Sequence, residues 1–110
     1  MRRWISIAKR DDLQDGELIE VVIGAEVLAV YRLRDNYFVT DGICTHERAH
    51  LADGCVIGGI IECPKHQGRF DIGRGMPKGA PASRPLRTYL VRLDGEDVCV
   101  ELEEASPSAE

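Results

Sequence analysis

Residues 44–71 of the chain read CTHERAHLADGCVIGGIIECPKHQGRFD, and this stretch contains two short pairs of cysteine and histidine. The first pair is Cys44-Thr45-His46, and the second, sixteen residues further on, is Cys63-Pro64-Lys65-His66. A single cysteine or histidine is more often an ordinary buried or surface side chain than a ligand. Four such residues in two mixed pairs favour metal ligation.

The composition of each pair distinguishes two kinds of metal centre. A Cys₂His₂ zinc finger groups its cysteines in one pair and its histidines in another, with wider spacing. A Rieske-type [2Fe–2S] centre has two thiolates on one iron and two imidazoles on the other, so each loop supplies one of each. Cys44 and Cys63 would then bind one iron, and His46 and His66 the other. A structural zinc module is the weaker alternative. Measurement of bound metal and sulfide would distinguish it from a [2Fe–2S] centre.

On both sides of this stretch the sequence predicts β-strands. Short runs rich in β-branched residues are bounded by turn signals such as Asp15-Gly16, Gly24 and Asp35-Asn36. We expect strands at 4–7, 18–23, 27–31 and 37–39, forming a β-meander, short apolar runs at 56–57 and 60–61, and a final hairpin of 88–93 and 98–102. The Asp94-Gly95 turn would connect that hairpin. The fold class is therefore predicted to be all-β, with a sandwich or barrel of short strands.

Length and charge limit what the chain can be. At 110 residues it fits a single domain, expected over 1–103, with 104–110 as a disordered acidic tail. A net charge of −5 disfavours a nucleic-acid partner and favours basic surfaces on other proteins. No apolar run approaches the ~18 residues of a membrane helix, and no apolar signal core follows Arg2-Arg3. We therefore expect a cytoplasmic monomer with no membrane partner.

Several segments match the pattern of one known family. They are Cys44-Thr45-His46-Glu47, Leu51-Ala52-Asp53-Gly54, Gly58, Ile61-Glu62-Cys63-Pro64, His66-Gln67-Gly68-Arg69-Phe70-Asp71, Pro81-Ala82 and Pro85-Leu86. From Trp4 to about Leu102, the chain resembles the Rieske ferredoxin component of bacterial aromatic ring-hydroxylating dioxygenases. The resemblance implies an antiparallel β-sandwich with a small cluster-binding subdomain, about 42–80, and one [2Fe–2S] cluster per chain.

The same resemblance implies a carrier role without catalysis. Electrons would pass from an NAD(P)H-dependent flavoprotein reductase through the cluster to a terminal oxygenase in the breakdown of aromatic compounds. A terminal oxygenase subunit would need a further large domain with its own iron site, which 110 residues cannot hold. The alternative is a small subunit of an assimilatory nitrite reductase, whose Rieske-like fold often lacks full ligation. The presence of all four ligands here weighs against it.

Three positions separate the chain from respiratory and photosynthetic Rieske proteins. Ala49 and Lys65 stand where those proteins have an additional cysteine in each loop, and Gly68 stands where a serine hydroxyl would bond a bridging sulfide. Fewer donors to the cluster stabilise its reduced form less. We therefore predict a reduction potential near the lower end of the Rieske range of roughly −150 to +300 mV.

The remaining candidate residues receive plainer interpretations. His50 is expected to be an ordinary surface side chain, and Cys55 and Cys99 to be structural. Pro64 is expected to shape its loop, and Gly68 to permit close approach of the backbone to the cluster. The histidine ring edges should reach the surface for electron transfer. Candidates for contact with redox partners are Glu47, Arg48, His50, Gln67 and the segment Pro81 to Pro85.

Overall fold

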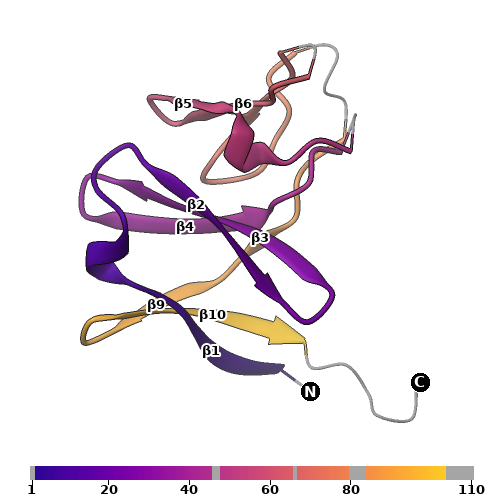
Figure 1. The fold of residues 1–110 in the computed structure, drawn as a ribbon. Helices are drawn as coiled ribbons and strands as arrows, with labels where there is room; N and C mark the ends of the chain where they lie inside the picture. Colours follow the sequence, from indigo (N-terminus) through magenta and orange to yellow (C-terminus); the bar gives the residue numbers. More distant parts are fainter. Residues whose placement is uncertain (1, 46–47, 66, 80–83, 104–110) are drawn as a thin grey trace, which may run out of the picture.

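The computed structural model describes residues 2–45, 48–65, 67–79 and 84–103. In these ranges the chain forms three antiparallel sheets and two short 3₁₀ helices (Figure 1). The strands are β1 (Arg2–Lys9), β2 (Leu18–Ile23), β3 (Glu26–Leu33), β4 (Asn36–Asp41), β5 (Cys55–Ile57), β6 (Ile60–Glu62), β7 (Arg69–Asp71), β8 (Thr88–Tyr89), β9 (Val91–Asp94) and β10 (Asp97–Glu103). The helices are η1 (Arg10–Asp12) and η2 (Leu51–Asp53). The predicted all-β class is confirmed.

The first sheet has the strand order β1-β10-β9. β1 pairs with β10 from Arg2↔Glu103 to Lys9↔Asp97, and β10 pairs with β9 across the predicted hairpin turn. The predicted meander through the first forty residues is therefore wrong for β1. After β1, η1 leads the chain away to the second sheet, and pairing with β10 buries the apolar side chains of β1 against Val98 and Val100.

The second sheet has the order β2-β3-β4-β8, and its β2-β3-β4 part is the meander that the sequence predicts. The strand expected over 88–93 is in fact two strands. β8 pairs with β4, β9 pairs with β10, and the exposed Leu90 lies between them. This segment thus passes from the second sheet into the first. We call these two sheets the body.

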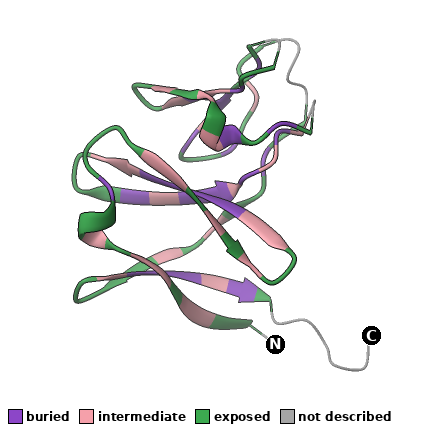
Figure 2. Ribbon diagram, in the orientation of Figure 1, coloured by how far each residue is buried: buried purple, intermediate pink, exposed green. Residues whose placement is uncertain are grey.

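The core of the body lies between its two sheets. Side chains from β3 and β4 pack against those of β10 there; the buried members are Leu13, Leu28, Val30, Tyr37, Val39, Val98, Val100 and Leu102. Figure 2 shows the same distribution as buried segments along β3, β4 and β10. No helix in the described part of the chain is long and apolar enough to cross a lipid bilayer.

The third sheet, β5-β6-β7, is small and lies at one end of the body (Figure 1). We call it the small sheet. Its residues Ile61 and Phe70 are fully buried against Tyr31 of β3, whose hydroxyl is hydrogen-bonded to Thr40 at 2.9 Å. Leu51 of η2 and Leu86 complete this second core. The small sheet is therefore packed on the second sheet of the body.

Candidate metal centre

Two loops next to the small sheet begin with the predicted cysteine ligands. We call residues 44–49 the first Cys loop and residues 63–68 the second. The first is bracketed by a bridge between Ile43 and His50, and the second by the β6–β7 pair Glu62↔Arg69. Each loop is therefore the tip of an antiparallel hairpin.

The same main-chain hydrogen bond closes both loops. The N–H of Cys44 donates to the carbonyl of Ala49 at 2.9 Å, and the N–H of Cys63 donates to the carbonyl of Gly68 at 2.6 Å. Each bond spans five residues. The two cysteines thus occupy equivalent places in two similar loops, although 19 positions separate them in the sequence.

Both cysteines face one apolar core. Cys44 is 3% exposed and Cys63 is 1% exposed, and both belong to the cluster that contains Leu51, Ile61 and Phe70. Neither takes part in a disulfide. Hydrophobic burial of the two β-hairpins therefore brings the two predicted sulfur ligands into the same region, which spacing alone could only suggest.

The donor set suits iron–sulfur ligation. The Lys65 N–H donates to Sγ of Cys63 at 3.4 Å, an N–H···S bond of the kind that stabilises a thiolate bound to iron. Two cysteines at equivalent places on hydrogen-bonded main chain offer the two thiolate ligands that one iron of such a cluster needs. His46 and His66, the predicted imidazole ligands, lie outside the described residues, as do Glu47 and Pro81 to Ser83.

Those residues predicted to contact redox partners that the structure describes lie on the surface. Arg48, His50, Gln67 and Pro85 are all exposed, and so is Pro64. Gln67 has a positive φ of 59°, which is uncommon for a residue other than glycine and turns the second Cys loop sharply. Ala49 and Gly68 are buried at the closing bonds of the two loops.

His50 is exposed, as expected, but it is more than an isolated surface side chain. Its Nδ1 lies 2.5 Å from Oε1 of Glu20 on β2. This hydrogen bond, together with the carboxylate charge, raises the pKa of the His50 imidazole. The pair connects the first Cys loop to the body. Of the two cysteines expected to be structural, Cys99 is buried in β10, whereas Cys55 is exposed on β5 and is not a core residue.

A reciprocal pair of hydrogen bonds, not foreseen from the sequence, ties the first Cys loop to the segment before β8. Oγ1 of Thr45 donates to the carbonyl of Arg84 at 2.8 Å, and Nη2 of Arg84 donates to the carbonyl of Thr45 at 2.9 Å. The two residues are 39 positions apart. No local pattern in the sequence identifies such a pair.

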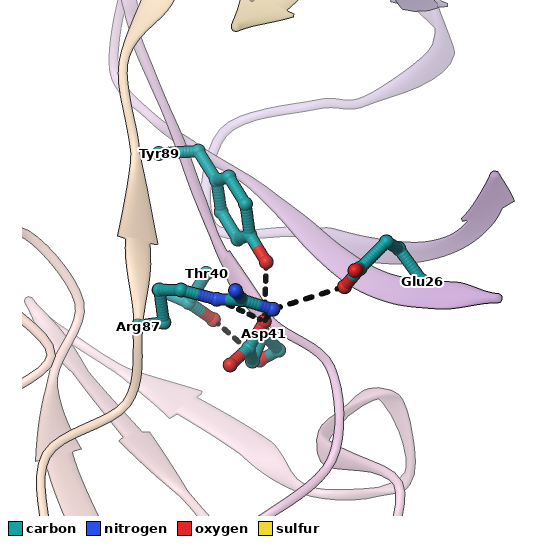
Figure 3. Close-up of polar contacts among 5 residues, drawn as sticks. All are labelled: Glu26, Thr40, Asp41, Arg87 and Tyr89. Carbon is teal, nitrogen blue, oxygen red and sulfur yellow. Dashed lines mark hydrogen bonds and ion pairs between the residues drawn. The ribbon is translucent and has the colours of Figure 1, made fainter. Parts of the chain in front are cut away.

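A second unforeseen feature is a polar network at the end of β4 (Figure 3). Oδ1 of Asp41 accepts hydrogen bonds from Tyr89 Oη at 2.5 Å and from Arg87 Nη2 at 3.3 Å, and Arg87 also pairs with Glu26 at 3.0 Å. Burial, followed by the bond to Asp41, raises the pKa of the Tyr89 phenol, so it remains a donor. Because Asp41 lies three residues before Cys44, the network fixes the origin of the first Cys loop.

Comparison with known proteins gives a consistent family. The model of the Rieske [2Fe-2S] domain matches residues 3–90. The ferredoxin component of the naphthalene 1,2-dioxygenase system of Pseudomonas aeruginosa is 35% identical over 100 residues, covering 91% of this chain and 96% of that protein.

Solved structures agree with this family. The ferredoxin of Sphingomonas yanoikuyae B1 has a TM-score of 0.87 at 38% identity, covering 92% of this chain and 100% of its own. A chain in the complex of reduced oxygenase and oxidized ferredoxin in carbazole 1,9a-dioxygenase has a TM-score of 0.83 at 38% identity. The match covers 88% of this chain and 91% of that chain.

The nitrite reductase alternative has weaker support. A putative nitrite reductase small subunit has a TM-score of 0.76 but is only 19% identical over 89% of this chain and 97% of its own, which indicates a shared fold alone. The relatives at 35–38% identity are instead ferredoxins of dioxygenase systems. The chain therefore belongs to the Rieske [2Fe–2S] domain family and is a ferredoxin of the dioxygenase type, an electron carrier with a [2Fe–2S] cluster rather than an enzyme.

Proposed function

We propose that Cys44, His46, Cys63 and His66 hold the cluster, and that the chain passes single electrons from an NAD(P)H-dependent flavoprotein reductase to a terminal ring-hydroxylating oxygenase. The observation that carries the ligand assignment is the equivalent closure of the two Cys loops around buried cysteines. Each loop supplies one thiolate from its buried base. Each also contains one histidine, at 46 or 66, between the residues that close it.

The residues of the chain would divide the work between two irons. Cys44 and Cys63, which are buried in the apolar core, would hold one iron, and His46 and His66 would hold the other. When bound, the cluster would carry one electron, and it would accept that electron more readily than an all-cysteine centre because two neutral imidazoles replace two thiolates. The Lys65 N–H stabilises charge on the Cys63 sulfur. The electron would then pass to a partner through the loops that contain His46 and His66.

The cluster-binding subdomain spans about 42–80 within a single domain of 1–103, and the protein is a cytoplasmic monomer. Its role in aromatic-compound breakdown is supported by relatives that serve naphthalene and carbazole dioxygenases. Size-exclusion chromatography with light scattering gives the mass directly, and a mass of twice 12.2 kDa would contradict the monomer.

Single substitutions at the four positions test the ligand set. We expect Cys44→Ser, Cys63→Ser, His46→Ala and His66→Ala each to abolish or strongly reduce the Rieske-type EPR signal and the bound iron and sulfide. Cys55→Ser is the matched control, because Cys55 is exposed and outside both loops, and it should keep the full signal. One zinc per chain without sulfide would contradict the assignment.

Turnover experiments test the carrier role. The purified protein, reduced by NADH and a flavoprotein ferredoxin reductase, should support product formation by a ring-hydroxylating oxygenase acting on its aromatic substrate. Omission of the protein should stop turnover. If the cluster is intact but no tested oxygenase of this class accepts its electrons, the pathway proposal fails while the ligand assignment stands.

A further inference from the structure

Charge is distributed unevenly along this acidic chain. Residues 42–87 contain seven basic and four acidic side chains, a net charge of +3, whereas the rest contains seven basic and fifteen acidic side chains, a net charge of −8. The segment with both Cys loops is thus basic within a protein whose total charge is −5. This uneven distribution of charge suggests that the two ends of the molecule differ in electrostatic potential.

The basic side chains nearest the Cys loops are exposed. Arg48 and Lys65 belong to the first and second Cys loops, and Arg84 is hydrogen-bonded to Thr45 of the first. We call these three residues the basic tip. Arg48 forms no ion pair with another described residue, whereas Arg69 of the small sheet is neutralised by Glu62 at 2.8 Å. Arg48 and Arg84 therefore contribute positive potential beside the proposed ligands.

Acidic side chains gather elsewhere, on turns of the body. Asp11 and Asp12 of η1 are exposed, as are Asp94 and Glu96 at the β9–β10 turn. Figure 1 places η1 and the β9–β10 turn at the lower left of the molecule, while β4 runs to the right, toward the first Cys loop. The charge asymmetry therefore follows the shape of the molecule, with the Cys loops away from these acidic turns.

We infer that the basic tip is the docking surface for redox partners and that it fits a protein surface rich in carboxylates around the partner's electron-transfer site. This inference rests on the proposed function, since it assumes that electrons leave through the Cys loops. Within a Debye length of about 10 Å, local charges outweigh the net charge, so the basic tip determines how a partner approaches. An acidic partner is attracted to the tip and repelled by the body, which orients the encounter. The expectation of a basic partner, drawn from the net charge alone, is thereby reversed.

Oxidation of the reduced holoprotein by small charged oxidants tests the sign of this potential. Ferricyanide, an anion, takes one electron from the reduced cluster and becomes ferrocyanide; tris(1,10-phenanthroline)cobalt(III), a cation, takes one electron and becomes cobalt(II). Stopped-flow rates are measured while NaCl is raised from about 10 to about 300 mM. We expect the ferricyanide rate to fall at least about threefold and the cobalt rate to rise. The opposite pair of trends, set by the net charge, would overturn the inference.

Variants that remove basic side chains test whether the salt-dependent oxidation rate is determined by the basic tip. The double variant Arg48→Gln/Lys65→Gln should lower the ferricyanide rate at low salt by roughly threefold or more and flatten its salt dependence. Arg84 is left unchanged because it also positions Thr45. The control Arg10→Gln/Arg34→Gln makes the same change of net charge on η1 and the β3–β4 turn, and should change the rate by less than half as much. Equal effects of the two double variants would overturn the docking assignment.

The outcomes also separate this inference from the function on which it rests. Each variant is first checked for its cluster by visible absorption and EPR. A wild-type chain without a Rieske signal would refute the proposed function, whereas an intact cluster with the opposite salt dependence refutes the basic docking surface alone.

Discussion

Tyr89 donates a hydrogen bond from Oη to Oδ1 of Asp41 at 2.5 Å, and so joins the strand that leaves the region of the Cys loops to the strand that enters it. Asp41 ends β4, and its own N–H donates to the carbonyl of Arg87 at 2.8 Å. Gly42, the next residue, donates to Val27 at 2.8 Å. The first Cys loop therefore starts from a point that is held on both sides.

Removing the hydroxyl group of Tyr89 should loosen the start of the first Cys loop. We expect Tyr89→Phe to lower the free energy of unfolding by about 1–2 kcal/mol, because a hydrogen bond to a charged acceptor is lost. Cluster release under mild denaturant should become faster. Tyr37→Phe is the control, since Tyr37 Oη donates to the neutral carbonyl of Arg10 at 2.9 Å. Urea titrations followed by circular dichroism measure both variants, and a larger loss for Tyr37→Phe would contradict the role of Asp41.

Gly54 is a site where one methyl group should disturb the small sheet. A Cβ at this position would lie 2.0 Å from the carbonyl oxygen of Glu62, the residue before Cys63. We expect Gly54→Ala to destabilise the protein by about 1–3 kcal/mol and to weaken cluster retention. At Gly59, in the turn between β5 and β6, an added Cβ meets nothing within 4 Å. Thermal unfolding should therefore show little change for Gly59→Ala, and equal effects at the two glycines would refute the steric explanation.

The pair of His50 and Glu20 predicts a pH dependence of stability. Because the hydrogen bond to Glu20 raises the pKa of His50, the folded state binds the proton more tightly than the unfolded chain does. The contribution of the pair is thus fully present below the unfolded value of about 6.5, and it is lost as the pH rises through the higher folded value.

NMR titration of the histidine ring signals measures this shift. Glu20→Gln should lower the pKa of His50, and the difference in melting temperature between the wild type and this variant should shrink from about pH 5 to about pH 8. Asp11→Asn, which changes the net charge equally but lies on η1, should leave the pKa of His50 nearly unchanged. A His50 pKa at or below the ordinary value in the wild type would exclude the interaction in solution.

The reduction potential should respond to Gly68. Gly68 is not among the described residues with a positive φ, so its main-chain conformation does not require glycine. A hydroxyl at this position could donate to the cluster, and a hydrogen bond worth about 1.4 kcal/mol to the reduced form corresponds to about +60 mV. We expect Gly68→Ser to raise the potential by about that amount in an EPR-monitored redox titration. Gly68→Ala is the control for the added side-chain volume. A wild-type reduction potential well above zero would contradict the predicted low-potential centre.

Local sequence patterns were sufficient for most of the strands. Short apolar runs and turn signals such as Gly24, Asp35-Asn36 and Asp94-Gly95 identify β2, β3, β4 and the β9–β10 hairpin, because each pairing there is between neighbours in the chain. The pairing of β1 with β10 has no such local sign. The division of 88–93 at Leu90 is equally invisible, since it depends on which sheet each half meets.

The candidate site likewise combines features that the sequence predicts with features that only the structure reveals. The cysteine and histidine pairs are evident from their spacing, because ligand chemistry restricts residue types within a few positions. The supporting contacts are between distant residues: Thr45 with Arg84 across 39 positions, and Tyr89 with Asp41 across 48. Such pairs depend on the packing of whole sheets, and each partner alone resembles an ordinary surface residue. The structure is needed to find them.

The closing bonds of the two Cys loops have a consequence for assembly. They run from Cys44 to Ala49 and from Cys63 to Gly68 through main-chain atoms only, so their formation requires no iron. Both loops can therefore close around their cysteines before any metal arrives. The cluster would then enter loops whose two ends are already fixed by main-chain hydrogen bonds.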